Sequence, residues 1–225
     1  MTFQDLLARE FEPYGTLSNE QLALLESHYR LLLRWNQKLN LTRIEHLEEA
    51  IHLHYCESLF LATLLPAGPL RIADIGSGAG FPGIPVAVFR PECSVTLIES
   101  HQRKAVFLRE ASRGLQNVAV IAARAEDLSH TGTHTIDDTG VSADIRGAGP
   151  QPAEMTTTKP AQEFDWLISR AVAPAEVLKL SLARRMALLV GGEEAAHLRN
   201  ATRVPWGKDR FAVIVPSGTV PRETS

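Results

Sequence analysis

Hydrophobic and polar positions follow two different periods along the chain, and the change falls near Pro66. Before it, apolar side chains recur at the three- and four-residue spacing of a helix that buries one face, as in Leu22, Leu25, Tyr29, Leu32 and Leu39. Ser18 and Gln21 have the spacing of a capping box that starts this helix. A further helix is predicted from about residue 45 to residue 65. We therefore expect a helical layer over residues 1–65.

Beyond Pro66, short apolar runs alternate with helical spacers. The runs predicted as strands are 70–75, 94–99, 118–121, 164–169, 187–190 and 211–215. Strands joined through helices are usually parallel neighbours, so we expect an α/β domain with a largely parallel sheet over residues 66–215. Residues 129–163 lack aromatic side chains and bury too little apolar surface to offset their ordering entropy. We predict a disordered insertion there and a flexible tail at 216–225.

Composition narrows the class of protein. The chain has 225 residues, of which 44% are hydrophobic and 22% charged, and these values exclude a wholly disordered chain. Its longest strongly apolar stretch, 59–65, is far shorter than the ~20 residues of a membrane span, and residues 1–12 carry too many charges for a signal peptide. Only Cys56 and Cys93 are cysteines, which excludes a disulfide scaffold and indicates buried thiols in a cytoplasmic protein. The net charge of −3 excludes a uniformly basic surface but not a local basic patch.

A glycine-rich turn carries the strongest chemical signal. Residues 74–83 read Asp-Ile-Gly-Ser-Gly-Ala-Gly-Phe-Pro-Gly and follow the first predicted strand directly. The alternating glycines, which allow a sharp turn and close approach of a ligand, are Gly76, Gly78 and Gly80. Asp74 ends the first strand, and Glu99 ends the second about 20 residues after the glycines. A carboxylate at that place suits the two hydroxyls of a ribose.

Two cofactors fit this turn. Residues 78–83 match the G-x-G-x-x-G motif, so an NAD(P)-dependent oxidoreductase is one reading. A strand-end acid followed by three alternating glycines fits S-adenosylmethionine better, because that cofactor has no pyrophosphate and its aminocarboxylate needs polar main chain. Loops after the third and fourth strands, with residues 124–127 and 169–171, would complete the site. The remaining alternative is a non-catalytic RNA-binding module with a vestigial cofactor site.

Several separated motifs together resemble the GidB, or RsmG-type, family of bacterial 16S rRNA guanine-N7 methyltransferases. They are Trp35-Asn36, Asn40-Leu41-Thr42, His54 with Ser58, 74–85, 90–92, 97–100, Phe107-Leu108, Arg124 with Glu126, and Ser169-Arg170-Ala171. The resemblance implies a class I, Rossmann-like, S-adenosylmethionine-dependent methyltransferase with a seven-stranded, mostly parallel sheet and an antiparallel strand near its end. It also implies 16S rRNA as the partner, free, in an assembly intermediate or in the small subunit, and we expect a monomer without a membrane partner. The cofactor contacts that it implies are Gly76, Phe81, Glu99, Ala125, Glu126 and Arg170.

The chain departs from the family pattern in the long insertion, in Glu57, which stands where Asp is usual, and after the fifth strand. There the expected Lys-Gly is replaced by Gly191-Gly192-Glu193-Glu194. If that lysine contacts RNA phosphate in relatives, Arg199, Arg203 or Lys208 must replace it here. Basic residues predicted to line an RNA surface on the helix after the second strand are Arg103, Lys104, Arg109 and Arg113. A second basic stripe, read as a solvated helix face or as phosphate contacts, contains Arg30, Arg34 and Lys38.

The implied reaction explains why the sequence offers no catalytic base. Guanine N7 has an in-plane lone pair and no proton to lose, so methyl transfer needs alignment and exclusion of water. Arg170 is expected to orient the base, or else to pair with Glu99 or Glu126. No metal site is expected, because the spacing of His52, His54 and Cys56 in a helix points them apart. Trp35 and Trp166 are expected in the core.

Overall fold

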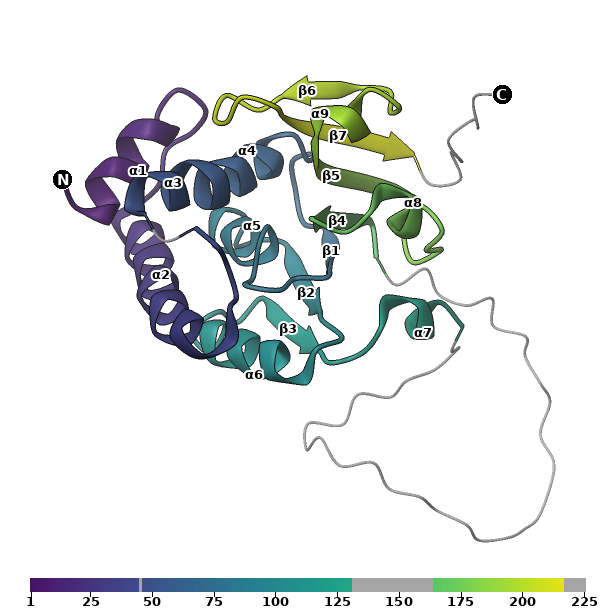
Figure 1. Cartoon of the computed structure of the whole chain (residues 1–225), viewed down its shortest axis with the longest axis horizontal. Coiled ribbons are helices and arrows are strands. Elements are labelled where there is room, and N and C mark those ends of the chain that lie inside the picture. The colour runs from purple at the N-terminus through teal and green to yellow at the C-terminus, as the bar shows by residue number, and fades with distance from the viewer. Residues whose placement is uncertain (45, 131–163, 217–225) are drawn as a thin grey trace, which may run out of the picture.

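The structure, a computed structural model, describes residues 1–44, 46–130 and 164–216 (Figure 1). The α-helices are α1 (Phe3–Phe11), α2 (Asn19–Leu39), α3 (Leu47–Ala50), α4 (Glu57–Thr63), α5 (Gly83–Phe89), α6 (Gln102–Ala111), α7 (Ala125–His130), α8 (Pro174–Val177) and α9 (Gly192–Ala195), and a π-helix, η1, spans Ile51–Cys56. The strands are β1 (Arg71–Ile75), β2 (Ser94–Ile98), β3 (Val118–Ile121), β4 (Trp166–Arg170), β5 (Arg185–Gly191), β6 (Ala201–Arg203) and β7 (Arg210–Pro216). Residues 129 and 130, predicted as the start of the disordered insertion, belong instead to α7, and Pro216, predicted as the start of the tail, belongs to β7. The remaining residues of those two predictions, 131–163 and 217–225, lie outside the described part of the chain.

The seven strands of the described residues form one sheet in the order β3-β2-β1-β4-β5-β7-β6. The pairs among β1 to β5 are parallel, whereas β7 runs antiparallel to both β5 and β6. The predicted seven-stranded, mostly parallel α/β sheet is therefore confirmed, with its antiparallel strand near the end. The chain order reverses between β1 and β4, and ligands of open α/β sheets bind in the crevice at the carboxyl ends of strands where this happens.

Alternate residues of each central strand point to opposite faces of the sheet, and each face is buried against its own helices. On β1, Ile72 packs with the N-terminal helices and with α5 and α6, whereas Ala73 belongs to a second apolar cluster that includes Val177 of α8. Figure 1 shows α1 to α5 gathered on one side of the sheet and α8 on the other. Both faces are covered, which is why these strands read as nearly continuous apolar runs.

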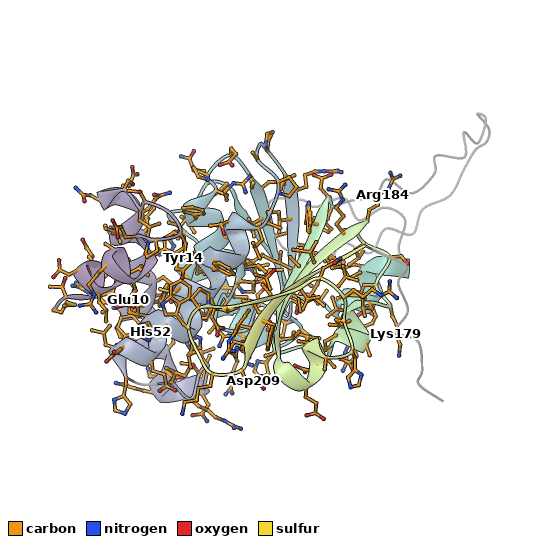
Figure 2. All side chains as sticks on the ribbon, turned by 90° about the horizontal axis from the view of Figure 1, so that it is seen from above. Glu10, Tyr14, His52, Lys179, Arg184 and Asp209 are labelled. Carbon is orange, nitrogen blue, oxygen red and sulfur yellow. The ribbon has the colours of Figure 1, made fainter. Side chains whose placement is uncertain are left out.

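The N-terminal helices are fixed by specific contacts as well as by apolar burial. Ser18 accepts a hydrogen bond from the backbone N–H of Gln21, whose side chain accepts one from the Ser18 N–H, so the predicted capping box is present. The Nε2 atom of His52 in η1 lies 3.1 Å from Oε2 of Glu10 in α1, and the two residues lie near each other in Figure 2. The first contact fixes the start of α2, and the second joins α1 to η1 within the helical layer.

The structure differs from the sequence-based elements in two further places. The single helix predicted over 45–65 is divided into α3, η1 and α4, with a π-helical turn at Ile51–Cys56. The seventh strand, β6, is missing from the predicted runs because all three of its residues are exposed and show no apolar alternation. No helix of the described residues is long and apolar enough to cross a membrane.

Candidate functional site

The glycine turn leaves β1 and folds over the end of β2. The backbone N–H groups of Gly76 and Ser77 both donate to the carbonyl of Ile98, at 2.9 and 3.2 Å. All three glycines have positive φ, with values of 68° at Gly76, 54° at Gly78 and 87° at Gly80, a conformation that side-chain-bearing residues rarely adopt. The backbone conformation is therefore sufficient reason for glycine at these three positions, before any ligand is considered.

The turn is packed on one side and open on another. A Cβ at Gly76 would lie 2.6 Å from Val172, in the loop after β4, and one at Gly80 would lie 2.5 Å from Ile84. At Gly78 the nearest atom is a backbone oxygen 3.7 Å away, so this residue faces open space. The middle glycine is thus the place where a ligand can approach the main chain.

Glu99, directly after β2, reaches this open part of the turn. Its Oε2 accepts a hydrogen bond from the Gly78 N–H at 2.9 Å, and its Oε1 accepts one from the His101 N–H at 2.7 Å. The residue is only 6% exposed. Each carboxylate oxygen can accept more than one hydrogen bond, and each accepts one here, so both can still accept from a pair of hydroxyl groups. A carboxylate at the end of the second strand is the group that binds ribose hydroxyls in dinucleotide-binding folds, and binding of a ribose by Glu99 stays a prediction.

Asp74 supports the turn from its buried side. Its Oδ2 accepts a hydrogen bond from the Gly83 N–H at 3.0 Å, at the start of α5, while its Oδ1 is buried without a partner in the described residues. Burial is the main cause that raises the pKa of Asp74 to about 7; the nearby Glu99 adds to the rise, and hydrogen bonds from Gly83 and Ser77 oppose it. The structure therefore places Asp74 beneath the turn, and a direct contact with a cofactor stays a prediction.

Phe81, in the glycine turn, contacts Arg170 at the end of β4. The Arg170 guanidinium lies over the Phe81 ring with Cζ 5.9 Å from its centroid, and the His54 ring stacks on Phe81 at 4.5 Å. Arg170 forms no ion pair with either Glu99 or Glu126 in the described structure, and its Nη1 is buried without a partner there. Burial lowers the pKa of Arg170 to about 10, so the guanidinium stays charged at neutral pH.

Two buried histidines near the turn were not among the predicted site residues. His28 of α2 contacts the Tyr55 hydroxyl through Nδ1 at 2.8 Å and the Ala79 carbonyl through Nε2 at 3.0 Å. His54 contacts the Thr42 hydroxyl at 2.8 Å. Burial lowers the pKa to about 4 for His28 and about 2 for His54, so both rings are neutral. The sequence signal that could have identified His28 is its position as a polar residue on the apolar face of α2.

A buried ion pair joins the helical layer to the last strand. Arg210 donates to both carboxylate oxygens of Glu57, at 2.9 and 3.0 Å, and Glu57 is fully buried. Glu57 also contributes to the charge around Arg170. The residue that departs from the family pattern therefore keeps a carboxylate beside the two arginines. Both cysteines are buried as predicted, and burial raises the pKa of the Cys56 thiol.

The remaining candidates fall into separate groups. Ala125 and Glu126 begin α7 after β3, with Ala125 buried and Glu126 exposed at the carboxyl end of the sheet. The basic residues of α6 and its C-terminal turn lie near edge strand β3, whereas Arg203 is on the opposite edge strand, β6, and donates to the Lys208 carbonyl at 2.7 Å. The structure therefore does not bring the predicted RNA-binding residues together. They are Arg103, Lys104, Arg109 and Arg113 in the first group and Arg199 and Arg203 in the second.

The predictions for the basic stripe of α2 and for the two tryptophans, Trp35 and Trp166, are only partly confirmed. Arg30 pairs with Glu26 at 2.6 Å, as expected of a solvated helix face. Trp166 is buried in the core as predicted, whereas Trp35 is half-buried and donates from its indole nitrogen to Glu110 at 3.1 Å. Within the described residues there is no group of three or more His, Cys, Asp or Glu side chains arranged to hold a metal ion.

Comparison with known proteins gives a consistent picture. The family model described as rRNA small subunit methyltransferase G, GidB, matches residues 21–138. A protein of that name from Xylella fastidiosa is 35% identical over 187 residues, covering 73% of this chain and 84% of the relative. Another from Desulforamulus reducens is 34% identical over 174 residues, covering 76% and 61%. The chain spans about half the length of several other curated relatives.

A crystal structure described as a SAM-dependent methyltransferase from Aquifex aeolicus is similar to this chain at a TM-score of 0.47 and 16% identity, covering 75% of this chain and 93% of that one. The family model covers just over half of the chain, and the sequence similarity extends over most of the Xylella protein. The chain therefore belongs to the rRNA small subunit methyltransferase G (GidB) family.

Proposed function

We propose that this protein transfers a methyl group from S-adenosylmethionine to N7 of a guanine in small-subunit ribosomal RNA. The observation that carries the proposal is the contact between Glu99 and Gly78 at the carboxyl ends of β2 and β1, next to the switch point between β1 and β4. It puts a ribose-binding carboxylate beside the open part of a glycine turn. Family membership supports ribosomal RNA as the substrate and guanine N7 as the acceptor.

The residues at this edge fit the proposed cofactor. Gly78 leaves space against the main chain, Glu99 supplies acceptors for ribose hydroxyls, and the turn ends at the start of α5. When bound, S-adenosylmethionine supplies an electrophilic methyl group on a sulfonium sulfur. Residues proposed to form its site are Asp74, Gly76, Gly78, Gly80, Phe81, Glu99, Ala125, Glu126 and Arg170. Within this set, Asp74 and Gly76 shape the turn, and Glu99 holds it through Gly78.

The protein's part in the reaction is to position the guanine and exclude water. N7 carries no proton at neutral pH, so no side chain needs to accept one. The two buried histidines near the turn are neutral and hydrogen-bonded within the protein, which suits structural roles. Arg170, charged and with a buried Nη1 that has no partner in the described residues, is the group best placed to orient a polar edge of the base. We propose positioning as its role.

The test is methyl transfer by the purified chain with radiolabelled S-adenosylmethionine. Deproteinised small-subunit RNA, assembly intermediates and intact small subunits serve as parallel substrates, which also settles the assembly state that the enzyme uses. N7-methylguanosine in the digested RNA is the expected product, formed by a cytoplasmic, monomeric enzyme. Transfer to another position, or tight binding of NADH without any transfer, would contradict the proposal. Glu99→Ala is the matched inactive control.

A further inference from the structure

A hollow of about 430 Å³ lies between α2, α5 and the end of α6, apart from the open face of the glycine turn. Figure 1 shows α2 running beside α6 on the helical side of the sheet, and the two helices are in contact. Its volume is within the range of about 300–1,000 Å³ that is usual for pockets holding small ligands. The lining includes Leu31 and Ile84 as apolar surface and Arg34 and Arg113 as basic groups.

The two arginines come from separate segments of the sequence and line the same hollow. Arg34 belongs to the basic stripe of α2, and Arg113 follows α6, the helix predicted to face RNA. Both side chains are exposed, and neither has an ion-pair partner within the described ranges of the chain. Arg30, one turn before Arg34, is instead paired with Glu26. The two predicted basic surfaces therefore meet at the hollow, where Arg34 and Arg113 form no ion pair with another described residue.

The only carboxylate among the lining residues is engaged elsewhere. Glu110 accepts a hydrogen bond from the Trp35 indole at 3.1 Å, on the side where α2 packs against α6. The floor is apolar, with Leu31 and Ile84 nearly buried. A site with an apolar floor and two guanidinium groups at its edge matches one nucleotide unit of a single strand, whose base is flat and apolar and whose phosphate is anionic.

We propose that this hollow is a second RNA subsite, which binds one nucleotide of the substrate strand outside the cofactor site. Arg34 and Arg113 bind the phosphate, and the apolar floor receives the base or the ribose. The inference rests on the proposed function, since it takes RNA to be the substrate. His28 connects the hollow to the glycine turn, because it lines the hollow and its ring bonds to the Ala79 carbonyl.

The test measures binding of a fluorescently labelled single-stranded RNA by anisotropy over a series of salt concentrations. Arg34→Ala and Arg113→Ala should each lower the affinity by about tenfold and reduce the dependence on log salt by ~0.7, the value for one neutralised phosphate. Arg30→Ala is the matched control on the same helix, and it should leave both quantities nearly unchanged because Arg30 does not line the hollow and is paired with Glu26. S-adenosylhomocysteine affinity should stay unchanged in all three variants.

A second pair of variants tests the hollow itself without changing charge. Ser27 is exposed and lines the hollow, so Ser27→Phe should fill it and lower RNA affinity with the salt dependence intact, whereas Ser27→Ala should not. Arginine variants that behave like Arg30→Ala would overturn the subsite, and so would full RNA affinity in Ser27→Phe. Neither of these results would contradict the proposed methyl transfer. A chain that binds no RNA at all would overturn both the subsite and the proposed function.

Discussion

The His28 imidazole and the Ala79 carbonyl are joined by a hydrogen bond of 3.0 Å that connects α2 to the middle of the glycine turn. Because a carbonyl only accepts, Nε2 of His28 is the donor, and Nδ1 must then accept from the Tyr55 hydroxyl at 2.8 Å. The helical layer thus fixes the position of the cofactor turn through one fully satisfied, neutral side chain. This gives the N-terminal helices a role in the site that burial alone would not.

Replacing His28 by Phe should therefore weaken the cofactor site from a distance. The ring volume is roughly kept, but the Ala79 carbonyl and the Tyr55 hydroxyl lose their partner, and each unpaired buried group costs about 1–3 kcal/mol. We expect the free energy of unfolding to fall by about 2–4 kcal/mol and S-adenosylhomocysteine affinity to fall several-fold. Urea unfolding and calorimetry measure the two quantities. His197→Phe, at an exposed position, is the control, and equal cofactor affinity in both variants would argue against the role.

His28 also shows what the sequence can and cannot reveal. The period of α2, the capping box and the glycine turn after β1 are local patterns, so they predicted the elements and the sheet well. The partner of His28 lies 51 residues away, and no local pattern indicates that α2 crosses this turn. The same holds for Glu57 and Arg210, which are 153 residues apart. Strand β6 was missed for a different reason, since its three exposed residues have no apolar signal.

Chain order predicted where Glu99 lies, although its contact with a cofactor stays a prediction. Glu99 was expected near the glycines because parallel strands end at one edge of a sheet, and it contacts Gly78 there. Asp74 lies near the end of β1 as predicted, but its contact with a cofactor stays a prediction, because a sequence does not tell whether a carboxylate faces a ligand or the backbone beneath it. Pairing of Arg170 with Glu99 or Glu126 was left open, and the Phe81 ring lies beneath its guanidinium instead.

Glu99→Ala should lower S-adenosylhomocysteine affinity by about 10- to 100-fold, since the hydroxyls of a bound ribose lose charged acceptors worth about 1.5–3 kcal/mol. Glu99→Gln, which keeps one acceptor oxygen, should lose less. Titration calorimetry gives both values, and Glu20→Ala on the exposed start of α2 is the control. Unchanged affinity in Glu99→Ala would place the ribose elsewhere.

The buried Asp74 should make stability depend on pH in an unusual direction. Its pKa is raised from 3.8 to about 7 in the folded protein, so the native state holds this proton over a range where the unfolded chain has lost it. Its contribution to stability is therefore complete below about pH 4 and is lost as the pH rises through 7, by at most about 1.4 kcal/mol per pH unit.

Asp74→Asn removes this titration while keeping the shape of the side chain. The difference in unfolding free energy, variant minus wild type, should rise between about pH 4 and pH 7 and level off above that range. Chemical denaturation over this range measures it, and the difference cancels the titrations that the two proteins share. Parallel stability curves would show that Asp74 does not titrate there.

The Glu57–Arg210 pair should respond unequally to loss of either partner. Arg210→Ala leaves a fully buried carboxylate without its two hydrogen bonds, which costs about 3–5 kcal/mol. Glu57→Gln should cost less, because the Arg210 side chain is 29% exposed and can reach water. Unfolding free energies of both variants, with Arg71→Ala as an exposed ion-pair control, test the order. A larger loss for Glu57→Gln would contradict it.

The pH dependence of the chemical step distinguishes positioning from base catalysis. Guanine N7 has no proton to lose, and near the turn the pKa is about 4 for His28, about 2 for His54 and about 10 for Arg170. With RNA and cofactor saturating, the single-turnover rate should then be nearly flat between about pH 6 and pH 9. Asp74 lies beside the turn and its pKa of about 7 falls inside this window, so Asp74→Asn is the necessary control.

Arg170→Ala should lower that rate by at least tenfold without changing the shape of the profile, because it removes orientation and not a proton acceptor. Arg170→Lys keeps the charge but loses the planar fork of donors, so it should recover only part of the rate. Rapid-quench measurement of labelled RNA gives each value. A rate that climbs tenfold per pH unit, in wild type and in Asp74→Asn alike, would require a titrating base. It would then favour an acceptor that carries a proton, such as an exocyclic amine, over N7.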